Sequence, residues 1–135
     1  DVYKRQALAG LVAITAEPLT PGPITAMFIG SIGAIIMYFG TKMLESYGLD
    51  DVVGAIPVHM FAGIFGTLVV PLTNSDTSFG TQFIGTASVC IFSFGLSWAT
   101  FTILKSTVGL RISKAAEKLG TDKAEVGVTA YSIRD

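Results

Sequence analysis

Long runs without a charged residue alternate with short polar connectors along most of this chain. Three of these runs have 18 or more residues: Ile24 to Thr41, Val52 to Ser75 and Thr77 to Leu104. An α-helix needs about 20 residues to cross the hydrocarbon core of a bilayer. Each run therefore predicts a transmembrane helix, and the longest predicts a tilted or kinked one.

A fourth apolar run, Ala7 to Ala16, has only ten residues. Ten residues rise about 15 Å as a helix, which is half a bilayer, so we expect a truncated helix and a chain that is a fragment. Residues 1–6 are expected to be a non-native or disordered end. The predicted organisation is a transmembrane region over 7–108, with helices at about 7–16, 24–46, 52–72 and 78–107, followed by a tail over 109–135.

Basic residues fall on one side of this predicted arrangement. Four crossings place the N-terminus, the 42–51 connector and the tail together, and all nine Lys and Arg residues lie in these parts. The opposite connectors, 17–23 and 71–78, carry only Glu17 and Asp76 as charges. The positive-inside rule then predicts a cytoplasmic tail.

Composition agrees with an integral membrane protein and narrows the chemistry. Half of the residues are hydrophobic, 14% are charged, and the mean hydropathy is +0.62. The single cysteine, Cys90, excludes an intrachain disulfide and a cysteine metal cluster. We expect no enzyme activity, no cofactor, no metal and no nucleic-acid partner.

His59 is the only histidine and lies near the middle of the second long run. Ala55, His59 and Gly63 are four positions apart and share a helix face, and Pro57 is expected to bend the helix. A titratable ring at this depth marks either a transport pathway or a packed, hydrogen-bonded structural imidazole. Haem or metal ligation and a catalytic triad both lack partner residues.

Small residues at helical spacing predict close helix packing, with Ala26, Gly30 and Ala34 in one run, Ala62 with Gly66, and Gly95 with Ala99. The sequence of the tail predicts a short amphipathic helix that has Ser113 as its N-cap and ends at Leu119, before Gly120.

Three stretches, ALAGLVAITA (7–16), DDVVGAIPVHMFAGIFGTL (50–68) and TVGLRIS (107–113), together resemble the C-terminal part of the ammonium transporter family, Amt/Mep/Rh. The resemblance implies an all-α membrane protein of eleven helices, with two inverted five-helix repeats and a last helix. It also implies a homotrimer with one pore per subunit, of which this chain would supply the last four helices.

The resemblance also implies roles for individual residues. His59 matches the second of two pore histidines, so ammonium would lose a proton and ammonia would pass an apolar pore lined by His59, Ala55 and Gly63. The protein would lie in the plasma (inner) membrane. Arg111 and Tyr131 would belong to its cytoplasmic tail and serve in regulation.

Some positions depart from the family pattern. Met60 stands where glycine is common and Pro57 where serine is common. A PII-type nitrogen-sensing protein is a candidate partner, although Val126-Gly127-Val128 stands where the family often has His-Gly-Glu. The alternative function is a small polytopic membrane scaffold or anchor subunit with a structural histidine.

Overall fold

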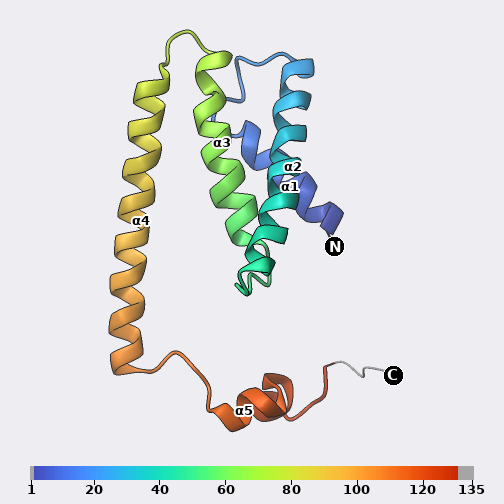
Figure 1. The fold of residues 1–135 in the computed structure, drawn as a ribbon, viewed down its shortest axis with the longest axis vertical. Coiled ribbons are helices and arrows are strands. Elements are labelled where there is room, and N and C mark those ends of the chain that lie inside the picture. The colour runs from blue at the N-terminus through green and yellow to red at the C-terminus, as the bar shows by residue number, and fades with distance from the viewer. Residues whose placement is uncertain (1, 131–135) are drawn as a thin grey trace. The chain divides into compact units, whose positions relative to one another are not determined.

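The computed structural model describes residues 2–130, and all of their regular structure is helical (Figure 1). The elements are α1 (Val2–Ile14), α2 (Pro23–Ser46), the π-helical η1 (Ile56–Phe61), α3 (Ala62–Val69), the 3₁₀-helical η2 (Val70–Leu72), α4 (Phe79–Thr107), α5 (Lys114–Leu119) and the π-helical η3 (Asp122–Val126). The chain divides into two compact units, residues 1–91 and 92–135, with the boundary inside α4.

Two of the predicted transmembrane helices have the expected bounds. α2 and α4 lie within one residue of the predicted 24–46 and 78–107, and both are long and apolar enough to cross a membrane. Proline at the first position starts α2, because its missing N–H needs no partner there. The third helical segment is shorter than predicted, since it runs over Ile56–Leu72 and leaves residues 52–54 in a turn.

The first helix begins earlier than predicted, at Val2 in place of Ala7. The expected disordered end thus corrects to helix over residues 2–6. One interaction that holds this end is the hydrogen bond from Arg5 Nη2 to the Val52 carbonyl oxygen, at 2.8 Å. The helix ends at Ile14 and does not reach the predicted Ala16.

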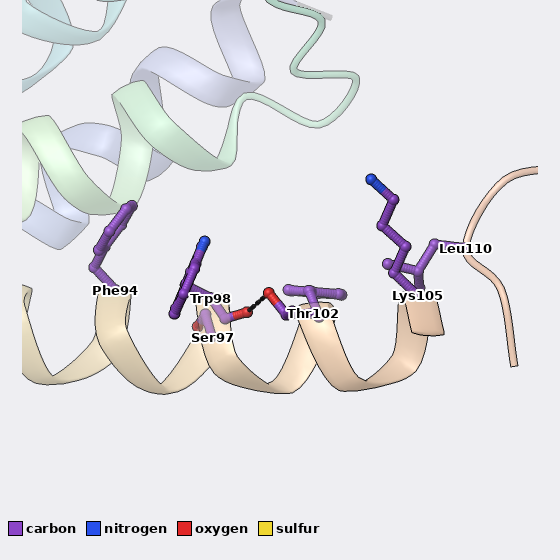
Figure 2. Close-up of a pocket in the computed structure, with 7 residues that line it drawn as sticks. Phe94, Ser97, Trp98, Thr102, Lys105 and Leu110 are labelled. Carbon is purple, nitrogen blue, oxygen red and sulfur yellow. Dashed lines mark hydrogen bonds between the residues drawn. The ribbon is translucent and has the colours of Figure 1, made fainter. Parts of the chain in front are cut away.

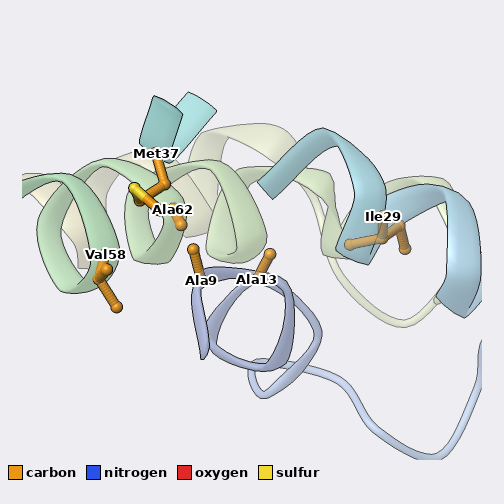
Figure 3. Packing of buried hydrophobic residues seen from close by; sticks show 6 residues of the cluster. All are labelled: Ala9, Ala13, Ile29, Met37, Val58 and Ala62. Carbon is orange, nitrogen blue, oxygen red and sulfur yellow. The ribbon is translucent and has the colours of Figure 1, made fainter. Parts of the chain in front are cut away.

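Small residues allow α1 to lie close to α2 and to the α3 segment. Ala9 and Ala13 of α1 are fully or almost fully buried, and Figure 3 shows them facing Val58 and Ala62 of the third segment. Met37 and Ile29 of α2 complete this core. Dispersion contacts of this kind, without a hydrophobic drive from lipid, hold membrane helices together.

Some of the small residues that were predicted to allow close packing do lie against another helix. A Cβ on Gly66 would collide with the backbone of Ala13, and one on Gly33 would lie 2.6 Å from the Ala13 Cβ. Gly30 faces the Gly10 backbone. Gly95 of α4 has no neighbour within 4 Å in the described part of the chain, so its predicted role in packing is not seen there.

Hydrogen bonds pair the connectors of unit 1 as alternating crossings require. Asn74 Nδ2 donates to Glu17 Oε2 at 2.7 Å, which joins the α1–α2 and α3–α4 connectors. The Arg5 bond to Val52 joins the start of α1 to the α2–α3 connector. Helices α1 and α2 and the third segment therefore run in alternating directions.

Unit 2 contains the C-terminal part of α4 and the tail. α4 ends at Thr107, and Gly109, two residues later, has a φ of +85° that suits glycine after a helix. Ser113 caps α5 as predicted, because its Oγ accepts the Ala116 N–H at 3.2 Å. Asp122 Oδ2 then accepts the Ala130 N–H at 2.8 Å, and this bond is the main cause that lowers the pKa of Asp122.

Candidate functional site

The segment that carries His59 begins at a cap formed by Asp51. Both carboxylate oxygens accept backbone N–H groups, Oδ1 from Ala55 and Oδ2 from Ile56, each at 2.8 Å. Gly54, with φ of +72°, forms the turn between the aspartate and the helix. The carboxylate satisfies donors that have no partner within the helix and favours the positive end of its dipole.

Pro57 occupies the first turn of this segment. A proline in the first turn removes no intrahelical bond, since that N–H lacks a partner in any case. The segment is nevertheless irregular here, because Pro57 lies within the π-helical turn Ile56–Phe61, after which the Ala62 N–H reaches the Pro57 carbonyl oxygen. Such π-helical turns occur often at functional sites.

His59 lies inside this π-helical turn, and its side chain is exposed. Its neighbours Pro57 and Val58 are buried, and so are Ala62 and Gly66 one and two turns later. The segment therefore packs one side against α1 and α2 and presents His59 on another. Within residues 2–130 no hydrogen bond to the imidazole is found.

The two other predicted pore residues, Ala55 and Gly63, differ in how far they are buried. Ala55 is exposed like His59. Gly63 is half-buried, and a Cβ placed on it would lie 3.7 Å from Val12 Cγ1 of α1. The structure thus leaves Ala55 and His59 open and brings Gly63 toward α1.

The predicted tail residues have different outcomes. Arg111 forms an ion pair with Glu117 of α5, with Nη2 2.8 Å from Oε1, and both side chains are well exposed. This pair joins the exit of α4 to the tail helix. Tyr131 lies outside the described residues.

Sequence reasoning missed the capping role of Asp51, although Asp50 and Asp51 were part of the family resemblance. An aspartate four residues before the first helical residue, followed by glycine, was the available signal. It was missed because the uncharged run was read as helical from Val52. In the part that the structure describes, no group of three His, Cys, Asp or Glu residues could hold a metal ion.

The arrangement offers one exposed imidazole, whose ring nitrogens can take part in hydrogen bonds, on an apolar helical segment with its start capped by Asp51. It can exchange a proton or a hydrogen bond with a small polar species.

Comparison with known proteins establishes the family of the chain. The family description "Ammonium Transporter Family" matches residues 5–131. Ammonium transporter Amt2 of Archaeoglobus fulgidus is 38% identical over 93% of this chain, and Amt2 of Methanocaldococcus jannaschii is 34% identical over 92%. An ammonium transporter of Corynebacterium glutamicum is 32% identical over 93%. The chain spans about a third of the length of these relatives, 31% in each case. The chain belongs to the ammonium transporter family and is a membrane protein with transmembrane helices.

Proposed function

We propose that this chain forms part of a pore that moves ammonium across a membrane as ammonia, with His59 in the pore wall. One observation carries the proposal: the sole histidine, near the start of its helical segment, is exposed and without a hydrogen-bond partner in the described residues, while the other side of the segment packs. A polar ring left open on a membrane helix is costly unless a water-accessible or substrate-accessible passage faces it.

The chemistry of the substrate fits such a wall. A bare cation entering an apolar passage loses hydration that costs many kcal/mol, and potassium has no means to avoid this loss. Ammonium can leave its proton behind and continue as ammonia. A neutral imidazole then offers a donor and an acceptor that offset the lost hydrogen bonds of ammonia.

The remaining features of the proposal concern the larger assembly. The chain supplies the last four of eleven helices in each subunit of a homotrimer, in the plasma (inner) membrane, with the tail on the cytoplasmic side. Ala55 and Gly63 border the His59 site. Arg111, through its ion pair with Glu117, positions the tail helix for regulation, with a PII-type protein as the candidate partner.

A scaffold or anchor with a structural histidine fits less well. That function expects an imidazole packed and hydrogen-bonded against a neighbouring helix, whereas His59 is exposed beside the buried Pro57 and Val58.

A chimera tests the proposal. Residues 5–131 replace the matching third of the Archaeoglobus fulgidus Amt2, and the trimer is purified and reconstituted in vesicles. We expect an ammonium gradient to drive current and an equal potassium gradient to drive far less. A correctly assembled chimera without ammonium current, beside an active parent Amt2, would overturn the proposal.

A further inference from the structure

A shallow groove of about 350 Å³ runs along the C-terminal part of α4, within unit 2. Its lining residues recur at helical spacing on one face, and Leu110 closes it beyond the helix end. Figure 2 shows Phe94, Trp98 and Lys105 projecting from the same side of α4.

The wall of the groove is apolar along most of its length. Phe94, Trp98 and Phe101 are 74%, 66% and 57% exposed. The hydroxyl of Thr102 turns back to the helix, where Oγ1 donates to the Trp98 carbonyl oxygen at 2.7 Å (Figure 2). Apart from the Ser97 hydroxyl and the Trp98 indole N–H, a ligand on this surface therefore meets mainly carbon atoms until it reaches Lys105.

The dimensions of the groove fit one leaflet of a bilayer. Phe94 and Lys105 are eleven residues apart, which corresponds to about 16 Å along a helix. Half of a hydrocarbon core of about 30 Å is about 15 Å. An acyl chain laid along the aromatic side chains would thus bring its headgroup to the level of the lysine.

The basic residues near the end of the groove favour an anionic headgroup. From Thr77 to Ala116 the sequence has three basic residues, Lys105, Arg111 and Lys114, and no carboxylate. Arg111 is paired with Glu117, and Lys105 has no carboxylate partner among residues 2–130. A lysine at the end of an apolar groove is complementary to a lipid phosphate.

We propose that this groove binds an anionic phospholipid, with an acyl chain along Phe94, Trp98 and Phe101 and the phosphate at Lys105. The inference goes beyond ammonium transport and rests on α4 spanning the bilayer with this face toward lipid. The bound lipid would cover the aromatic face of α4 in place of another protein helix.

Trp98 is the only tryptophan of the chain and lies inside the groove, so its fluorescence reports the occupant directly. The whole chain is reconstituted in phosphatidylcholine nanodiscs that contain a small fraction of brominated phosphatidylglycerol or, separately, brominated phosphatidylcholine. We expect stronger quenching by the brominated anionic lipid. Lys105→Gln should reduce this preference about fivefold, which corresponds to about 1 kcal/mol per basic residue.

Two matched variants separate a groove from general attraction to a basic tail. Lys105→Arg keeps the charge and should keep the preference. Lys114→Gln removes a neighbouring charge that does not line the groove and should leave the preference nearly unchanged. Equal quenching by both lipids, equal losses in Lys105→Gln and Lys114→Gln, or no quenching at all would overturn the proposal, the last because protein would then cover Trp98.

Discussion

Glu17 and Asn74 are 57 positions apart, yet the Asn74 amide donates a 2.7 Å hydrogen bond to the Glu17 carboxylate. The bond ties the connector that follows α1 to the connector that follows η2. It fixes these two ends of the helices at one level, which is the arrangement that antiparallel crossings need.

This bond makes stability depend on pH. The Asn74 donor, followed by the Leu19 N–H, lowers the pKa of Glu17 below its ordinary value of 4.5. A lowered pKa contributes stability above 4.5 that is lost as the pH falls through the value in the folded state. We expect Asn74→Ala to melt at a lower temperature than the original chain at pH 7, and the two melting temperatures to converge at pH 3.

Thermal unfolding in detergent at both pH values measures this effect. Ser75→Ala, a change at an exposed position of the same connector, is the control. A gap between Asn74→Ala and the original chain that is unchanged at pH 3 would contradict the role given to the carboxylate.

The Asp51 cap should stabilise the start of the His59 segment. Asp51→Ala removes both acceptors from the Ala55 and Ile56 N–H groups and should cost about 1 kcal/mol. Asp50→Ala is the matched control, because Asp50 accepts neither N–H group. Denaturation by a graded mole fraction of SDS gives both values, and equal losses in the two variants would argue against the cap.

The contact of Gly66 with the Ala13 backbone predicts intolerance of any side chain. Gly66→Ala should destabilise the chain by about 1–3 kcal/mol, because the added methyl group meets backbone that cannot move aside cheaply. Gly95→Ala has open space and should gain up to about 1 kcal/mol from helix propensity. The same denaturation measurement compares them, and similar values for both would mean that α1 does not lie against α3 as described.

The fold follows from the sequence where one strong signal dominates. The uncharged runs, bounded by Lys, Asp and Pro, predicted the bounds of α2 and α4 to within one residue. Ser113 correctly predicted the start of α5. The start of the third segment was predicted wrongly because Val52 and Val53 are as apolar as the helix, and only the Asp51 cap and the positive φ of Gly54 exclude them from it.

The candidate site could be predicted from the sequence only in part. A histidine within a long uncharged run drew attention to His59, but no local pattern in the sequence predicts the π-helical turn around it or the burial of Pro57 and Val58 beside it. Similarly, spacing by four put Gly63 with His59, whereas contact with Val12 of α1 sets its position. What faces His59 in the assembled transporter stays a prediction.

The most direct test of the account is the ratio of ammonium to potassium current in vesicles that contain the Amt2 chimera with His59→Ala. Loss of one neutral hydrogen-bonding ring should lower this ratio by up to about tenfold, since such a bond is worth about 0.5–1.5 kcal/mol. Met60→Ala, an exposed neighbour in the same turn, should leave it unchanged. An unaltered ratio in His59→Ala, with normal trimer assembly, would contradict the placement of this imidazole in the pore wall.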